Sequence, residues 1–168
     1  MKSGLIGDEE LFNLCCQGWE IATQNLDKIV RRSMAVKIRL VQADPDERSQ
    51  RAALNLGHTV GHAVELASGY RLRHGEAVAI GMLAEARLSE SLGLGEAGLA
   101  NQIAEALSEM GLPSEIPPDM PRGAVMRAMG VDKKRSGGKL RFALPMRIGE
   151  VRVGVEVDHL EERLWSAS

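Results

Sequence analysis

The sequence predicts a mainly α, multihelical domain with a short β-hairpin near its C-terminus. Its 168 residues suit one domain that buries a core of its own. Segments in which apolar residues recur at helical spacing follow one another along the chain, and glycines close several of them. Alternating, β-rich sequence is concentrated near the end of the chain.

Residues 8–45 predict one short helix followed by one long helix. Asp8 suits the N-cap of the first, because its carboxylate can accept hydrogen bonds from the free amides of the first turn. Pro45 limits the second, because proline does not continue a helix. The charged segment 44–51 (DPDERSQR) then forms a connection.

Two helices are expected in the centre of the chain. The first runs from Arg51 to about Ser68 and is closed by Gly69, whereas the second runs over 74–92 and is closed by Gly93. Glycine readily adopts the left-handed conformation that ends a helix. The short connection between them predicts that the two helices pack antiparallel.

A further helix within 95–111 is expected to stop at Gly111, before a loop that holds four of the six prolines. A short helix that ends at Gly130 comes next. It leads to the predicted two-stranded hairpin and a terminal helix.

The hairpin pairs residues 139–145 (KLRFALP) with residues 150–157 (EVRVGVEV). Residues 158–168 (DHLEERLWSAS) close the chain as a helix. A glycine-rich turn between a strand and a helix, as a dinucleotide needs, is not found in the sequence. We therefore expect no NAD-binding domain within these residues.

Composition excludes several classes of function. Charged residues make up 26% of the chain and the net charge is −2, so no basic surface for nucleic acid is expected. The sequence has neither a run of 18 apolar residues nor a signal peptide at its start. Cys15 and Cys16 are adjacent and are poor candidates for a disulfide with each other. We expect a cytoplasmic chain with no nucleic-acid or membrane partner.

Three of the four histidines lie within 17 positions. On a wheel of about 100° per residue, one helix from Arg51 would gather a polar stripe within about 40° either side of that residue: Arg51, Asn55, His58, His62 and Glu65. Surface helices normally carry lysine and glutamate, because asparagine and histidine are poorer helix formers. The stripe therefore indicates a functional site rather than a solvated face.

Two glycines interrupt the same predicted helix. Gly57 and Gly61 each cost on the order of 1 kcal/mol relative to alanine in a helix interior. The cost is understandable if another backbone or a ligand comes close there.

The spacing of the histidines leaves two metal arrangements open. His58 and His62 have the i, i+4 spacing of two ligands on one helix, although Thr59 stands where a zinc-protease helix carries its catalytic glutamate. Antiparallel packing of the two central helices would instead bring His74 toward His58.

Two motifs in this region resemble the 3-dehydroquinate synthase family. Residues 54–65 (LNLGHTVGHAVE) are followed at the family's distance by residues 74–82 (HGEAVAIGM). The likeness extends to 2–8 (KSGLIGD), 44–58 (DPDERSQRAALNLGH) and 132–145 (DKKRSGGKLRFALP), and so covers essentially the whole chain. It implies that residues 1–168 form the family's C-terminal metal- and substrate-binding domain, without the NAD-binding N-terminal domain.

The resemblance implies that His58 and His74 bind a divalent metal, zinc or cobalt. It assigns His62 to the substrate phosphonate and to proton transfer rather than to the metal. The family's third ligand is a glutamate three positions before the lysine matched by Lys2, and it would precede Met1. We therefore expect weakened metal binding and interpret the chain as an excised or naturally truncated domain.

A set of substrate-contacting residues is implied in the same way: Lys2, Lys37, Arg51, Asn55 and Lys133. Arginine suits a bidentate contact to an anion, and lysines act as point charges for carboxylate and phosphate. Lys134 is the alternative to Lys133 for the phosphonate.

The implied activity is that of a lyase of the shikimate pathway, in aromatic amino acid biosynthesis. The family converts 3-deoxy-arabino-heptulosonate 7-phosphate to 3-dehydroquinate and phosphate with NAD, and the resemblance implies a homodimer for the full enzyme. We expect the isolated chain to be inactive. The alternatives are a non-catalytic metal- or anion-binding module, or half of a related sugar-phosphate cyclase completed by a separate NAD-binding chain. Arg51, Asn55 and His62 together favour dehydroquinate synthase.

Overall fold

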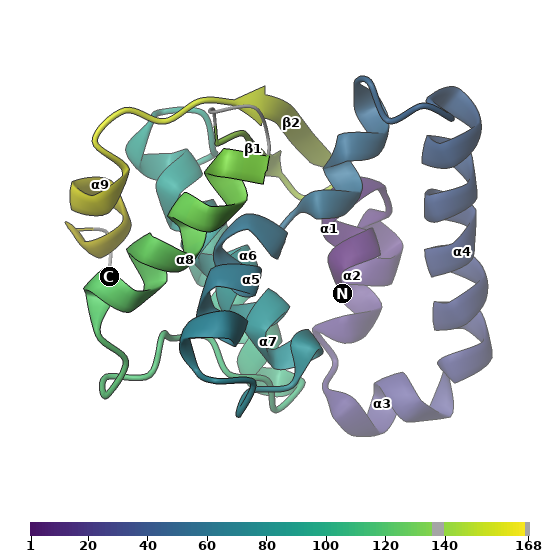
Figure 1. Ribbon diagram of the computed structural model, residues 1–168. Coiled ribbons are helices and arrows are strands. Elements are labelled where there is room, and N and C mark those ends of the chain that lie inside the picture. Colours follow the sequence, from purple (N-terminus) through teal and green to yellow (C-terminus); the bar gives the residue numbers. More distant parts are fainter. Residues whose placement is uncertain (136–139, 167–168) are drawn as a thin grey trace.

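A computed structural model describes residues 1–135 and 140–166 of the chain. It confirms the mainly α, multihelical domain with a hairpin near the C-terminus (Figure 1). The elements in chain order are α1 (Lys2–Gly7), α2 (Glu9–Cys15), α3 (Trp19–Gln24), α4 (Leu26–Ala43), the 3-10 helix η1 (Gln50–Asn55), α5 (His58–Ala67), α6 (His74–Ser91), α7 (Leu99–Glu109), α8 (Arg122–Arg135), β1 (Phe142–Arg147), β2 (Glu150–Val155) and α9 (Leu160–Ser166).

Helix α6 lies at the centre of the core. Its residues contribute to two buried clusters, one with Leu5 and Ile103 and the other with Val60 and Phe142. A helix that buries side chains on most of its circumference needs apolar or small residues nearly all round, and residues 77–83 provide them. Neither α6 nor any other helix in the described part of the chain has the length and apolarity to cross a membrane.

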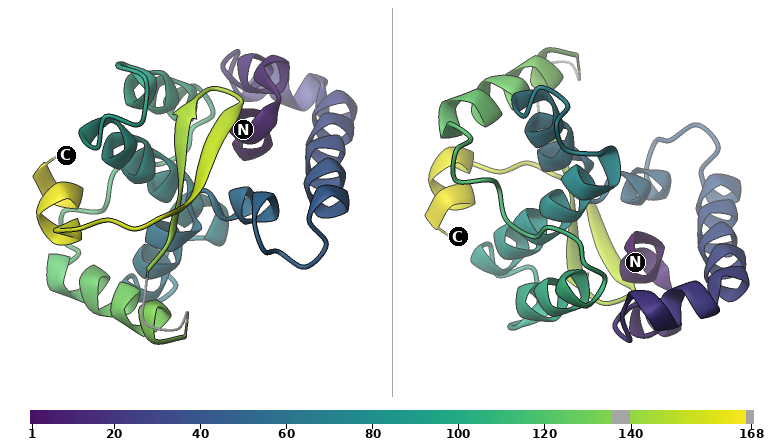
Figure 2. Two further views of the ribbon diagram at one scale, coloured as in Figure 1. Left: turned by 90° about the horizontal axis from the view of Figure 1, so that it is seen from above. Right: turned by 90° about the horizontal axis from the view of Figure 1, so that it is seen from below.

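The predicted hairpin is present, but its first strand covers 142–147 rather than 139–145, and residue 139 lies outside the described residues. Strands β1 and β2 pair antiparallel, with Phe142 opposite Val155 and Arg147 opposite Glu150. Gly149 occupies the turn at φ +85° and donates a hydrogen bond of 3.0 Å to the carbonyl of Leu5. The hairpin thus ties α1 to the rest of the molecule, as the view from above shows (Figure 2).

The prediction of one helix from Arg51 to Ser68 is wrong. The chain forms η1, leaves helical geometry at Leu56, and begins α5 after Gly57, which has φ +77°. The cause is close packing on α6: a Cβ atom on Gly57 would lie 2.7 Å from the carbonyl oxygen of Val78. A Cβ on Gly61 would lie 2.9 Å from the carbonyl of Ala77, so the expected close approach at both glycines is confirmed.

Other boundaries also differ from expectation. Residues 8–45 form three helices, because the chain turns at residues 16–18 and again at Asn25 between α3 and α4. Asp8 does cap the first of them, accepting from the amide of Leu11 at 2.9 Å. Helix α8 continues past Gly130 to Arg135, since that glycine lies in open space and nothing forces a turn there.

Helix α1 was not predicted, because the segment KSGLIG is short and rich in glycine. Its stability comes from tertiary packing instead: Leu5 and Ile6 are buried in the first core cluster. This helix carries the partly buried Lys2.

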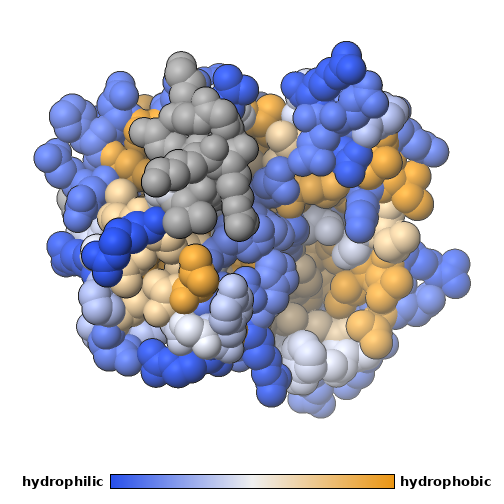
Figure 3. Space-filling model, in the orientation of Figure 1, coloured by the Kyte–Doolittle hydropathy of each residue, from blue (hydrophilic) through white to orange (hydrophobic). Residues whose placement is uncertain are grey.

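Helix α4 stands at the edge of the molecule (Figure 1). Val36 is its buried residue, and Arg32 fastens it to α2 by an ion pair of 2.6 Å with Asp8. One stripe along α4 faces solvent with large apolar side chains at i, i+4 spacing: Leu26, Val30, Met34 and Ile38, which are 47–60% exposed. We call these four residues the α4 stripe. Apolar colour gathers on this side of the space-filling view (Figure 3).

Candidate metal centre

Three imidazole rings meet beside the junction of α5 and α6: His58 and His62 lie on α5, and His74 begins α6. The ring centroids of His58 and His62 are 5.1 Å apart, those of His58 and His74 are 5.4 Å apart, and those of His62 and His74 are 5.7 Å apart. One nitrogen from each ring lies within 4.8 Å of the others, a spacing that could hold one metal ion. The antiparallel packing expected to bring His74 to His58 is confirmed.

His58 is held at the N-terminus of α5. Its Nδ1 atom lies 3.1 Å from the carbonyl oxygen of Leu56, which fixes the ring and leaves Nε2 free to bind a metal. Burial lowers the pKa of His58 to about 4, and the positive charge of Lys2 adds to the effect. The imidazole is therefore neutral near pH 7, which is the form that binds a metal.

His74 is held by a carboxylate. Its Nδ1 atom lies 3.3 Å from Oε2 of Glu65, which reaches across from α5. This contact leaves the Nε2 atom of His74 for a metal. Glu65 is one of three carboxylates near the histidines in the sequence; Glu76 instead accepts from the amide of Arg73 at the start of α6.

Lys2 reaches the same site from α1. Its Nζ atom donates to the carbonyl of Leu54 at 2.7 Å and lies 3.5 Å from Nδ1 of His58. Burial lowers the pKa of Lys2 to about 8; Glu85 opposes this shift, while Lys37 on α4 adds to it. The interaction of the two lysines indicates that Lys37, although exposed, acts on the same region.

Arg51 and Asn55 are turned toward the connection after α4. Asn55 donates to Oε1 of Glu47 at 3.1 Å. Arg51 contacts Oε2 of Glu47 at 3.5 Å and donates to the carbonyl of Pro45 at 2.6 Å. The polar stripe that one continuous helix would have formed is therefore divided at Gly57. The side chains of Lys133 and Lys134 lie outside the described residues.

One candidate functional residue, Glu85, was not identified from the sequence. Glu85 on α6 is fully buried, and its Oε2 atom accepts from the amide of Gly57 at 2.6 Å. Burial raises its pKa to about 8, although hydrogen bonds from the first turn of α5 act in the opposite direction. A helical wheel of α6 could have found it, because Glu85 follows Val78 and Met82 on a face that is otherwise apolar.

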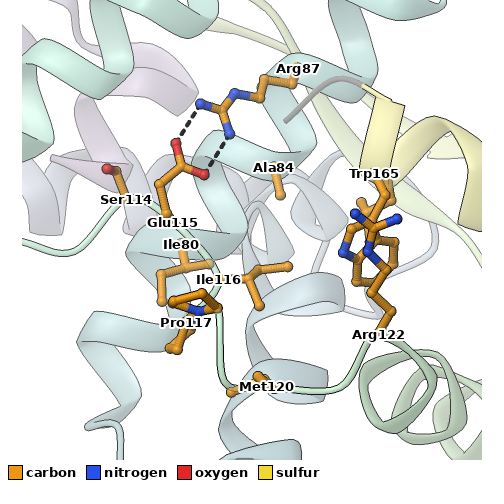
Figure 4. Close-up of a pocket in the computed structure, with 12 residues that line it drawn as sticks. Ile80, Ala84, Arg87, Ser114, Glu115, Ile116, Pro117, Met120, Arg122 and Trp165 are labelled. Atoms are coloured by element: carbon orange, nitrogen blue, oxygen red, sulfur yellow. Dashed lines mark hydrogen bonds and ion pairs between the residues drawn. The ribbon is translucent and has the colours of Figure 1, made fainter.

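A separate cavity of about 330 Å³ lies between α6, the loop before α8, and α9 (Figure 4). Arg87 and Glu115 form a two-point ion pair at its edge, at 2.9 and 2.5 Å. The guanidinium of Arg122 lies 5.7 Å from the ring centre of Trp165. The described residues that line this cavity include no histidine or cysteine, so it offers no second metal site.

The chain is similar in sequence to curated relatives over nearly its whole length. The chain is 39% identical over 160 residues to the 3-dehydroquinate synthase of Synechocystis sp., covering 91% of this chain and 44% of the relative. It is 40% identical over 173 residues to the 3-dehydroquinate synthase of Nostoc sp., covering 98% and 48%. The chain therefore spans about half the length of the curated relatives it matches.

Solved structures give the same fold. A 2-epi-5-epi-valiolone synthase from Streptomyces hygroscopicus subsp. jinggangensis, with NAD+ and Zn2+ bound, superposes with a TM-score of 0.83 at 25% identity, over 99% of this chain and 47% of the other. A 2-deoxy-scyllo-inosose synthase complexed with carbaglucose-6-phosphate, NAD+ and Co2+ superposes with a TM-score of 0.74 at 21% identity, over 85% and 41%. Residues 1–135 match the family model described as 3-dehydroquinate synthase C-terminal, and the chain belongs to that family.

Proposed function

We propose that this chain is the metal- and substrate-binding half of a 3-dehydroquinate synthase, a lyase that forms 3-dehydroquinate and phosphate from 3-deoxy-arabino-heptulosonate 7-phosphate. The observation that carries the proposal is the convergence of three imidazoles beside the amine of Lys2. Neutral imidazole nitrogens are common ligands of zinc, and a cation beside them favours an anionic substrate. The identity of 39–40% to relatives named 3-dehydroquinate synthase supports this choice of reaction.

The donor set fits zinc or cobalt. Imidazole nitrogen suits both metals, and hydrogen bonds on Nδ1 of His58 and His74 leave Nε2 of each ring available. We assign these two residues to the metal and His62 to the substrate phosphonate. A bound divalent metal would polarise a substrate hydroxyl and lower its pKa.

The lysines prepare the site for an anion. The amine of Lys2 is held by its hydrogen bond to the carbonyl of Leu54, so its positive charge already lies beside His58 before substrate binds. Lys37 adds a second positive charge from α4, and Lys133 is assigned to the phosphonate. Arg51 and Asn55 contact Glu47 here and would exchange those contacts for the substrate.

The hydride chemistry requires a second, NAD-binding half, which would remove a hydride from the substrate and later return it. The α4 stripe supports the presence of a covering partner, because exposed apolar surface on a helix commonly marks an interface. Lys37 lies three residues after Met34 and so shares its face, which puts this surface next to the substrate lysines. We propose that the stripe packs on the NAD-binding half, that the complete enzyme is a homodimer, and that this chain alone is inactive.

A related cyclase is the second candidate, since the 2-epi-5-epi-valiolone synthase has the same fold over nearly this whole chain. Its identity of 25% is lower than that of the dehydroquinate synthases. The substrate offered in the assay separates the two functions.

The test is reconstitution. The chain would be mixed, or fused, with the N-terminal half of the Nostoc relative, and phosphate release from 3-deoxy-arabino-heptulosonate 7-phosphate would be measured with NAD and zinc. We expect turnover that requires both halves and is lost in His58→Ala. Zinc binding without turnover by a correctly paired complex would favour a non-catalytic module. Turnover only of another sugar phosphate would assign the chain to a different cyclase.

A further inference from the structure

We propose that Glu85 is a positioning residue for the metal centre: its carboxyl group fixes the turn of backbone from which His58 and His62 project. The inference rests on the proposed function only in so far as the histidines bind a metal. Glu85 itself lies on α6, far from both of these histidines in sequence.

The side-chain hydrogen bonds of Glu85 run to the start of α5. Oε2 accepts from the amide of Gly57 at 2.6 Å, and Oε1 accepts from the amide of Val60 at 3.3 Å. Amides in the first turn of a helix have no partner within the helix, so a buried helix start needs an acceptor from elsewhere. The side chain of Glu85 is fully buried and supplies that acceptor.

Helix α5 cannot supply the acceptor itself. Its N-cap is Gly57, which has no side chain and a φ of +77°. A serine or aspartate at this position would place a Cβ atom 2.7 Å from Val78 and Met82 of α6. Close packing of the two helices therefore excludes an ordinary N-cap, and a carboxyl group from α6 takes its place.

This arrangement links both helices that carry the histidines. His58 is the first residue of α5, directly after the bonded amide of Gly57, and His62 follows one turn later. His74 begins α6, the helix that carries Glu85. Glu85 thus fixes the position of His58 relative to His74, which a shared metal requires to within a few tenths of an ångström.

The experiment compares two substitutions with a matched control. Glu85→Gln keeps an acceptor for Gly57, Glu85→Leu keeps the bulk but removes every acceptor, and Ser89→Ala alters a buried polar residue one turn further along the same helix. Zinc affinity would be measured by calorimetry, and coordination geometry by the visible absorption of bound Co2+. We expect Glu85→Leu to lose about 10- to 100-fold in affinity and to change the Co2+ spectrum. Glu85→Gln should stay within about 3-fold of the parent, and Ser89→Ala should match it.

A folded Glu85→Leu that binds zinc as tightly as Ser89→Ala would overturn the proposal. If Glu85→Leu does not fold, NMR of Glu85→Gln provides the test. The chemical shift of the Gly57 amide proton must change while metal affinity is retained. An unchanged chemical shift would show that Glu85 does not bond this amide and would overturn the proposal. A parent chain that binds neither metal contradicts the proposed function but leaves Glu85 testable. In that case hydrogen exchange at Gly57 and Val60 must be faster in Glu85→Leu than in Ser89→Ala, and equal exchange overturns the inference.

Discussion

The Nδ1 atom of His74 lies 3.3 Å from Oε2 of Glu65, across the junction of α5 and α6. A carboxylate in this position accepts a hydrogen bond from Nδ1–H, selects the tautomer with a free Nε2, and makes the imidazole a better ligand. The side chain of Glu65 is only 19% exposed, whereas that of His74 is 55% exposed, so the carboxylate is held in place while the ring stays accessible. Together with Leu56 behind His58, it orients two rings toward a common point.

Glu65→Gln should weaken zinc binding by about 10-fold, because the amide is a poorer acceptor for the Nδ1 proton. Calorimetric titration of the folded variant measures the change. Glu162→Gln is the control, since Glu162 stands beside the exposed His159 in an otherwise similar pair. An equal effect of both substitutions would show that general electrostatics, and not the Glu65 contact, sets the affinity.

Substitution of each histidine should separate ligands from a substrate contact. We expect His58→Ala and His74→Ala to lose most zinc binding and His62→Ala to change it little. The geometry leaves a real alternative, because all three rings have a nitrogen within 4.8 Å of the others. If His62→Ala abolishes calorimetric binding as completely as His58→Ala, the chain uses a three-histidine site and the assignment of His62 to the phosphonate is wrong.

Much of this fold could be predicted because local signals agreed with packing. Gly69, Gly93 and Gly111 adopt positive φ where helix ends were expected, and β2 follows its alternating pattern, whereas residues 142–145 of β1 are all buried. The break at Gly57 could not be predicted in the same way. Its cause is the proximity of α6, a contact between residues far apart in sequence, so a wheel drawn through Gly57 aligned Arg51 and Asn55 with the histidines incorrectly.

The site shows the same division. His58 and His74 could be paired in advance because a short connection between two helices constrains where the second begins. The place of Glu85 on an apolar face of α6 could be read from spacing, but its role could not, because that role depends on which amide its carboxyl group meets. Lys2 was identified by resemblance, while the helix that buries it depends on contacts of Leu5 and Ile6.

Glu85 should make the chain less stable as the pH rises. Its folded pKa of about 8 is above the ordinary 4.5, so the folded state holds the proton more tightly and loses that advantage as the pH rises through 8. His58, with a pKa lowered from 6.5 to about 4, gives the opposite slope below pH 6.5. Thermal unfolding should therefore be followed from pH 6.5 to 8, where the melting temperature of the parent should fall and that of Glu85→Gln should fall less. Parallel curves for the two proteins would contradict the assignment.

The α4 stripe should be needed for pairing with the NAD-binding half and not for metal binding. Met34→Lys puts a charge in the middle of the apolar surface, and its desolvation should weaken association by about 10-fold or more. Ala43→Lys introduces the same charge at an exposed position about 180° around α4 from Met34 and is the control. Size-exclusion chromatography of the two-half mixture measures pairing, and calorimetry should show unchanged zinc affinity in both variants. Undisturbed pairing by Met34→Lys would place the NAD-binding half on another surface.

Two glycines of α6 should respond in opposite directions to the same substitution. A Cβ atom on Gly81 would collide with the backbone carbonyl of Gly57, whereas one on Gly75 would meet nothing within 4 Å. Gly81→Ala should therefore lower the free energy of unfolding by about 1–3 kcal/mol or more, since neither backbone can yield without separating α5 from α6. Gly75→Ala should raise it by up to about 1 kcal/mol through helix propensity. Thermal unfolding resolves both, at roughly 2–4 °C per kcal/mol for a chain of this size. The collision lies at the turn held by Glu85, so Gly81→Ala should also reduce zinc affinity. A variant that melts at a lower temperature yet binds zinc normally would show that the helix contact and the metal centre are independent.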